Sequence, residues 1–222
     1  MKMYKKVMAA ALAGVMTVSM SATAFAADDD GYILKATNED SKSSDNDLVI
    51  AIEGSVSSMD PANIPDTNAI SATRGVYETL VSFDENQELT GKLAESWEVS
   101  DDSLTYTFKL RQGVKFQDGT DFNAAAVKAN YDRVVNKDNN LRQRRTFIVT
   151  NEDGSETPRV DSIETPDDYT LVIKLTQAWA PFINRLTQFC IISPAALEEY
   201  GNDIMNHPCG TCLLYTSDAA DD

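Results

Sequence analysis

Two cysteines stand three positions apart near the end of the chain, in the segment Cys209-Gly210-Thr211-Cys212. This spacing is used by thiol–disulfide exchange sites, in which one cysteine attacks as a thiolate and the other resolves the mixed disulfide. Such a site needs a long helix after its first cysteine and a βαβ setting before it. Here ten residues follow Cys212 and Pro208 precedes the pair. An exported thiol oxidoreductase is therefore kept as an alternative and is not our first hypothesis.

The other residues that could do chemistry are single and widely separated. Cys190 lies in the apolar run from Phe189 to Ile192, so we interpret it as a small buried hydrophobic residue. His207 is the only histidine, which leaves no parts for a His-rich metal site or a histidine-assisted triad, and its position before Pro208 indicates a structural role. We predict a protein that is not an enzyme, with no catalytic residues, no metal and no cofactor.

Charge and cysteine content limit the classes of partner. The 222 residues include 35 acidic and 19 basic side chains, for a net charge of −16. Such a surface repels nucleic acid, and we find no basic patch with interleaved aromatic residues. A solvated acidic surface that keeps an exported protein soluble is the simpler explanation. The three cysteines are an odd number, so at least one stays unpaired within the chain.

The start of the chain has the pattern of a secretion signal. Lysines precede an apolar run from Val7 to Val18, and small residues follow at Ala24 and Ala26. We predict a signal peptide over residues 1–26, because the apolar run is too short to span a bilayer. No cysteine lies near the cleavage point, so we expect a periplasmic or otherwise extracytoplasmic protein without a lipid anchor. Residues 27–46 are acidic and poor in apolar side chains, which predicts a disordered leader.

Structure is predicted to begin near Leu48 as a mixture of strands and helices in no regular βαβ order, which indicates an α+β fold. Alternation or apolar runs predict strands at residues 48–52, 97–99, 104–111, 114–116, 170–175 and 189–192. Helical spacing predicts helices at residues 67–80, 124–134, 181–186 and 194–200. The turn composition of residues 100–103 predicts a hairpin between the second and third strands. The polar stretch 136–159 is expected to be a surface excursion.

Capping residues and apolar stripes define the helices more closely. Thr67 is a capping candidate for the first helix, whose expected apolar face is Ile70, Thr73, Val76, Tyr77 and Leu80. Asp121 or Asn123 can cap the second, with a stripe of Ala124, Val127, Tyr131 and Val134 and with Asn130 among its polar residues. Ser193 is the expected cap of the last helix, with Pro194 in its first position.

Several motifs occur in one order that resembles family 5 of the ABC-transporter solute-binding proteins. They are Val76-Tyr77-Glu78-Thr79-Leu80-Val81, Leu93-Ala94-Glu95-Ser96-Trp97, Leu104 to Arg111, Gly113-Val114-Lys115-Phe116, Asp118-Gly119-Thr120, Ile192-Ser193-Pro194-Ala195-Ala196-Leu197 and His207-Pro208-Cys209-Gly210-Thr211. The resemblance covers roughly residues 48–211. Within the family, residues 116–133 look most similar to the glutathione-binding branch.

The resemblance implies a two-lobed clamp that closes over its ligand, of which residues 47–211 would supply an incomplete first lobe. It also implies the substrate-binding component of an ABC importer for peptides or glutathione, with a permease in the cytoplasmic membrane as partner and a monomeric state. A one-lobe accessory or sensory protein remains a further alternative.

The same resemblance places the loop after the first strand on the cleft side of the lobe. The residues expected to bind ligand there are Gly54, Ser55, Ser57, Ser58 and Met59. A glycine allows close approach of the backbone, and hydroxyl groups can bond to peptide atoms. The plainer interpretation is a connection between a strand and a turn that satisfies its own hydrogen bonds.

The last residues depart from the family pattern. After Thr211 the family continues with Gly-Pro and an aromatic residue, whereas this chain continues with Cys212. Residues 212–222 resemble the translated end of a sequencing adapter. Our hypothesis is that they are not native, which would also remove one cysteine of the CxxC pair.

Overall fold

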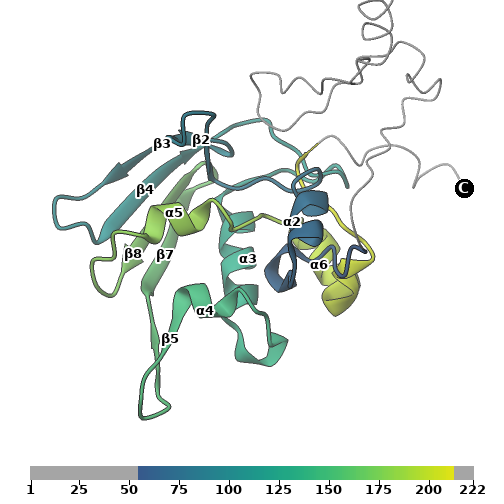
Figure 1. The fold of residues 1–222 in the computed structure, drawn as a ribbon. Coiled ribbons are helices and arrows are strands. Elements are labelled where there is room, and N and C mark those ends of the chain that lie inside the picture. The colour runs from purple at the N-terminus through teal and green to yellow at the C-terminus, as the bar shows by residue number, and fades with distance from the viewer. Residues whose placement is uncertain (1–54, 213–222) are drawn as a thin grey trace, which may run out of the picture. The chain divides into compact units, whose positions relative to one another are not determined.

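The computed structural model of the protein describes residues 55–212 (Figure 1). The expected signal peptide, leader, strand at 48–52 and Gly54 lie outside the described residues, as does the tail from residue 213. Among the helices between residues 55 and 212, none combines the length and apolar character needed to cross a membrane.

A four-stranded antiparallel sheet forms one layer, in the order β3-β4-β8-β7. These strands are β3 (Ala94–Val99), β4 (Thr105–Leu110), β8 (Thr170–Leu175) and β7 (Val160–Asp167). The expected hairpin joins β3 to β4, with Trp97 opposite Phe108. The neighbouring strand β8 pairs with β4 across about 60 residues of chain, with Leu171 opposite Phe108. The predicted α+β class is confirmed.

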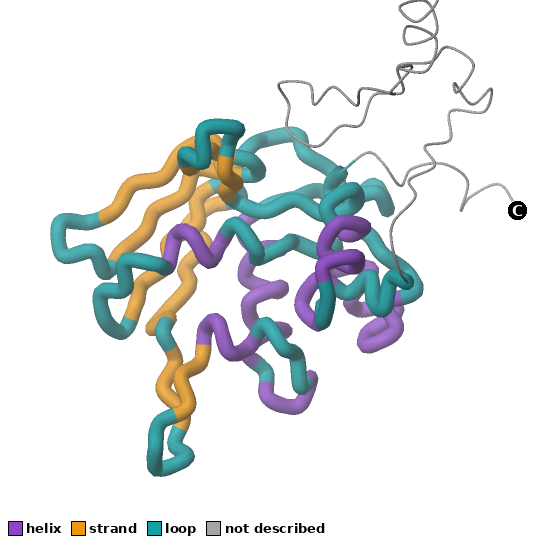
Figure 2. The backbone as a smooth tube through the Cα atoms, viewed as in Figure 1, coloured by secondary structure: helices purple, strands orange, loops and turns teal. Residues whose placement is uncertain are grey.

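Short elements surround this sheet. Two small hairpins pair β1 (Val81–Phe83) with β2 (Leu89–Gly91) and β5 (Ile148–Thr150) with β6 (Glu156–Pro158). The helices are α2 (Thr67–Thr73), α3 (Ala124–Val135), α4 (Arg144–Phe147), α5 (Phe182–Leu186) and α6 (Pro194–Tyr200). Three 3-10 turns are η2 (Pro61–Asn63), η3 (Lys137–Asn139) and η4 (Gly201–Met205). Figure 2 shows the sheet strands side by side, with α2 and α6 gathered away from them.

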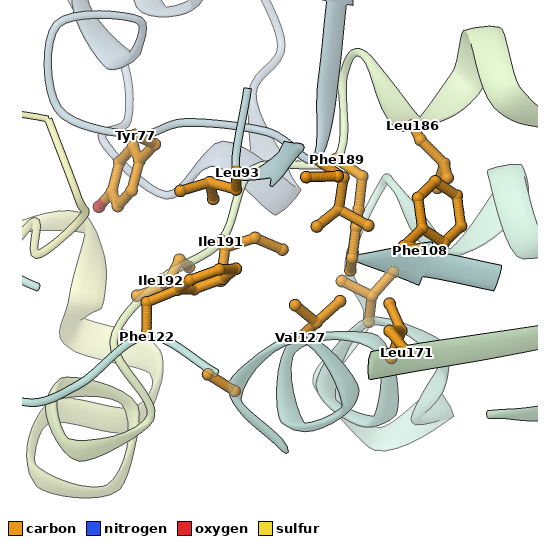
Figure 3. Packing of buried hydrophobic residues seen from close by; sticks show 14 of the residues in the cluster. Tyr77, Leu93, Phe108, Phe122, Val127, Leu171, Leu186, Phe189, Ile191 and Ile192 are labelled. Carbon is orange, nitrogen blue, oxygen red and sulfur yellow. The ribbon is translucent and has the colours of Figure 1, made fainter. Parts of the chain in front are cut away.

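The core lies on one face of the sheet. Alternate residues of β4 and β8 point into it and are buried, namely Tyr106, Phe108, Leu110, Leu171, Ile173 and Leu175. The α3 residues Ala124, Val127 and Val134 are buried in the same cluster, as are Phe182 and Leu186 of α5 (Figure 3). The period-2 pattern of the strands and the stripe of α3 were therefore predicted correctly, because both face one apolar layer.

The buried side chain of Asn130 joins α3 to the segment before α6. Its Nδ2 donates to the carbonyl oxygens of Ala126 at 2.9 Å and Ile192 at 2.7 Å, and its Oδ1 accepts from the Ile192 N–H at 3.0 Å. The prediction that Asn130 lies on the polar side of the helix is wrong. The strand expected at 189–192 is only a single bridge between Thr79 and Cys190. The Ile191 N–H still donates to the Glu78 carbonyl, but the backbone groups of Ile192 bond to the Asn130 side chain.

The first predicted helix ends earlier than expected. It stops at Thr73, and its cap is Asp66, whose carboxylate accepts from the Ala69 N–H. Ile70 is 41% exposed, while Val76 and Leu80 are buried in the chain that follows the helix. Gly75 lies in the turn after the helix, where low helix propensity favours termination.

Two further expectations change in detail. Residues 114–116 form no strand, and Lys115 makes only an isolated bridge to Asp121. The stretch 136–159 is not simply a surface excursion, because it carries the buried Phe147. The Phe147 ring lies 5.3 Å from the rings of both Tyr131 and Phe189 in edge-on contacts. An isolated aromatic residue in a polar stretch gives no periodic signal, which is why the pattern missed it.

Ser193 caps α6 as predicted, and a carboxylate fixes its orientation. The Ser193 hydroxyl accepts from the Ala196 N–H at 3.3 Å and donates to the Asp118 carboxylate. Burial alone would raise the pKa of Asp118, but hydrogen bonds from Ser193 and Thr120 outweigh it and hold that pKa below its usual value.

We expect Asn130→Ala to lower the free energy of unfolding by about 3 kcal/mol, because both backbone groups of Ile192 would lose their partner in the core. Chemical denaturation would measure the change. The control is Lys128→Ala, which removes an exposed pair with Asp132 on the same helix and should cost less than about 0.5 kcal/mol. Equal losses for the two variants would contradict this account of Asn130.

Candidate functional site

The described part of the expected ligand loop is mostly open to solvent. Ser55 and Ser57 are exposed, whereas Ser58 and Met59 are half-buried. Met59 packs against the hydrophobic core and so anchors the loop to it. Ser55 and Ser57 therefore present their side chains to solvent.

Ser57 ties the loop to the start of α2. Its hydroxyl donates to the Asp66 carboxylate, which also accepts from the Ala69 N–H at 2.9 Å. The hydrogen bond from Ser57 is the main cause that lowers the pKa of Asp66, with a smaller contribution from Ala69. Asp66 is thus an ionised acceptor that both caps a helix and fixes the Ser57 hydroxyl.

The hydroxyl of Ser58 has the opposite hydrogen-bonding role, because it accepts. Its Oγ accepts a hydrogen bond from the Asp60 backbone N–H at 3.1 Å. The Asp60 side chain turns the other way, and its Oδ1 accepts from the Ala62 N–H at 3.0 Å, which caps η2. Two consecutive serines of one loop therefore use their hydroxyls differently, one as donor and the other as acceptor.

A buried ion pair anchors the end of this loop to α3. The Arg133 guanidinium donates to both carboxylate oxygens of Asp60, at 3.2 Å and 2.7 Å. Both side chains are almost fully buried, with 11% of Arg133 and 7% of Asp60 exposed. Sequence reasoning missed this pair. The available signal was Asp60-Pro61, in which an aspartate stands before a turn, but its partner lies 73 residues away.

The backbone of the cysteine segment is held in the fold by hydrogen bonds and close packing. The Gly210 N–H and C=O bond to the side chain and backbone N–H of Gln117, and the Cys212 N–H donates to the Val76 carbonyl at 3.1 Å. A Cβ at Gly210 would lie 2.1 Å from the Val76 oxygen, so only glycine fits. The backbone of Cys209 is also committed, since its carbonyl accepts from the Ser193 N–H.

The thiols themselves are poorly suited to exchange chemistry. Cys209 is buried, and this burial raises the pKa of its thiol. Cys190 is half-buried as a residue, and burial of its thiol raises the pKa to about 12. Exchange requires a thiolate near neutral pH, so a raised pKa acts against it. The geometry does not favour the oxidoreductase alternative.

His207 takes part in a local surface contact. Its ring stacks on Tyr200 with centroids 4.0 Å apart, and its Nε2 lies 3.4 Å from an Asp203 oxygen. Tyr200 is the last residue of α6 and Asp203 lies in η4, so the His207 contacts join the end of α6 to the 3-10 turn that follows it. Between residues 55 and 212 no group of three or more His, Cys, Asp or Glu side chains could hold a metal ion.

Comparison with known proteins gives one consistent family. The model of the bacterial extracellular solute-binding proteins, family 5, matches residues 88–211. The glutathione-binding protein GsiB of Shigella dysenteriae serotype 1 is 38% identical over 200 residues, covering 89% of this chain and 34% of that protein. GsiB of Salmonella typhi is 42% identical over 167 residues, covering 74% of this chain and 31% of that protein.

Solved structures agree. NikZ from Campylobacter jejuni in complex with Ni(L-His) superposes with a TM-score of 0.64 at 27% identity, covering 75% of this chain and 32% of that one. The periplasmic binding protein DppA from Helicobacter pylori in complex with the peptide STSA superposes with a TM-score of 0.56 at 31% identity, covering 70% of this chain and 33% of that one. The chain thus spans about a third of the length of these relatives.

We expect Arg133→Gln to lower the free energy of unfolding by about 3–5 kcal/mol, because it leaves the buried Asp60 carboxylate without its counter-charge. Chemical denaturation would measure the change. The control is Arg144→Gln, which breaks a bidentate pair with Glu156 and a hydrogen bond to the Val135 carbonyl at a more exposed place, and it should cost clearly less. Equal costs would mean that burial of the Asp60 pair is unimportant.

We expect thiol titration of the folded chain to modify Cys212 first, with Cys209 and Cys190 reacting much more slowly. The physical reason is burial, which hinders access and disfavours the thiolate. Cys212→Ser should remove the fast phase, and the unmodified chain should not reduce insulin. A fast phase that persists in that variant and depends on Cys209 would contradict this view.

Proposed function

Because the chain belongs to the bacterial extracellular solute-binding proteins of family 5, we propose that it forms part of the substrate-binding component of an ABC importer. The proposed substrates are peptides or glutathione, and the proposed partner is the permease of that importer in the cytoplasmic membrane. The observation that carries this proposal is 42% identity over 167 residues to a glutathione-binding protein.

Within that protein, the part from residue 47 to residue 211 would be an incomplete first lobe. Its coverage of about a third of each relative supports this assignment. An open loop on one lobe cannot enclose a solute, whereas ligand sites generally bury most of the ligand surface. We therefore propose that the loop from Ser55 to Met59 contributes one wall of a cleft completed by other parts of the protein.

Glutathione is the preferred ligand within this proposal. Two relatives from different genera carry the name glutathione-binding protein, while the solved neighbours bind a peptide or a nickel–histidine complex. Ligand choice depends on the cleft and not on the scaffold, so the branch is argued from similarity alone.

We also propose export by the signal peptide over residues 1–26, a location outside the cytoplasm, and a monomeric state.

We expect a chimera to bind glutathione if residues 47–211 replace the matching stretch of the Salmonella typhi relative. Isothermal titration calorimetry would measure the dissociation constant for glutathione and for a panel of dipeptides and tripeptides. The chain by itself should bind these ligands more weakly than micromolar, because it lacks the rest of the cleft.

The unmodified relative is the positive control, and circular dichroism would confirm that the chimera is folded. A folded chimera that binds neither glutathione nor any peptide would refute the proposed ligand class. Micromolar binding by the chain alone would instead favour the one-lobe protein.

A further inference from the structure

We propose that Ser57 and Ser58 form a matched pair that reads an amide-bearing ligand, with Ser57 accepting from a ligand N–H and Ser58 donating to a ligand oxygen. This inference rests on the proposed function, since it assumes that the loop faces the ligand. It adds a specificity rule to that function, because it states which polar atoms each hydroxyl can recognise.

The polarity of Ser57 follows from Asp66. An ionised carboxylate has no proton to give, so the hydrogen bond between them must use the one hydroxyl proton of Ser57. Oδ1 of Asp66 is engaged by the Ala69 N–H, which holds the carboxylate in place. The single proton of the exposed Ser57 is therefore engaged while lone pairs of its Oγ stay available, so this hydroxyl can serve a ligand only as an acceptor.

The polarity of Ser58 follows from Asp60. The backbone N–H of Asp60 is a donor, so the Ser58 Oγ must accept in that hydrogen bond. No acceptor for the Ser58 proton occurs among residues 55–212. The half-buried hydroxyl can therefore give its proton to a carbonyl or carboxylate oxygen of a ligand.

Arg133 acts as a positioning residue for this arrangement. Its bidentate contact holds the Asp60 carboxylate against α3, and the backbone N–H of the same residue supports Ser58. The Asp60 carboxylate also caps η2 through the Ala62 N–H. The position of the Ser58 oxygen is thus held by a residue that belongs to a buried ion pair.

These two requirements select a class of ligand. A peptide bond offers both an N–H donor and a carbonyl acceptor, and glutathione carries amide groups as well as carboxylates. An inorganic anion offers acceptors only, so it could engage Ser58 but not Ser57. An ester analogue keeps the carbonyl oxygen of an amide and lacks its N–H, which separates the roles of the two serines.

The test uses the chimera described above and three probes, namely glutathione and two analogues in which one or the other amide is replaced by an ester. We expect one ester analogue to bind three- to tenfold more weakly than glutathione, in keeping with the loss of one hydrogen bond. Ser57→Ala should weaken glutathione by a similar factor and leave the affinity for that analogue unchanged. Ser58→Ala should weaken all three probes by about the same factor.

The control is Ser71→Ala, which removes another exposed serine whose hydroxyl bonds to the Thr67 carbonyl within α2, and it should leave all affinities unchanged. Ser57→Thr keeps the hydroxyl and should retain binding. If a chimera that binds glutathione loses the same factor for amide and ester probes on Ser57→Ala, the inference is wrong while the proposed function stands. Should Ser57→Ala fail to fold, equal affinity of the unmodified chimera for glutathione and both esters would overturn the inference.

Discussion

The described fold depends most directly on the buried amide of Asn130. Residues 189–193 pass beside α3 without a continuous strand partner, and the Asn130 side chain satisfies both backbone groups of Ile192 there. Arg133 lies three positions further along α3, where its guanidinium holds Asp60. One helix therefore carries two polar contacts in succession, to the segment that leads into α6 and to the loop of the candidate site.

Long-range contacts make the ends of the described region part of one unit. Thr211 donates to the Glu78 carboxylate at 2.9 Å, and Gln117 donates to the Cys212 carbonyl at 2.7 Å. These contacts join residues 133 and 95 positions apart, so the chain must close large loops before they form. Gly210 packs closely against the Val76 carbonyl in the same region of the fold. The residues of the CxxC segment are thus held at this junction by backbone hydrogen bonds and by the close approach at Gly210.

The sequence predicted those elements whose signal is local. Alternation identified β4 and β8, and the capping residue Ser193 identified the start of α6. For α3 the sequence offered Asp121 or Asn123, and the structure shows Asn123 as the cap. Local signals failed where the decisive partner is distant. Asn130 looks like a surface residue until the backbone of Ile192 lies against it, and Arg133 looks solvated until Asp60 arrives. For the candidate site, the serines stay a prediction from the family resemblance, and the structure adds that Ser57 donates its hydrogen bond whereas Ser58 accepts one.

The acidic character of the chain contrasts with the uncharged side chains that the loop exposes. The chain has a net charge of −16, yet both carboxylates beside the loop are engaged in contacts within the chain, Asp60 with the buried Arg133 and Asp66 with Ser57 and the start of α2. The loop residues that stay exposed, Ser55 to Ser57, are uncharged. A buried ion pair of this kind adds little net stability compared with apolar packing, but breaking it is costly. Its value here is orientation, because it fixes Asp60 and the loop that ends there against α3.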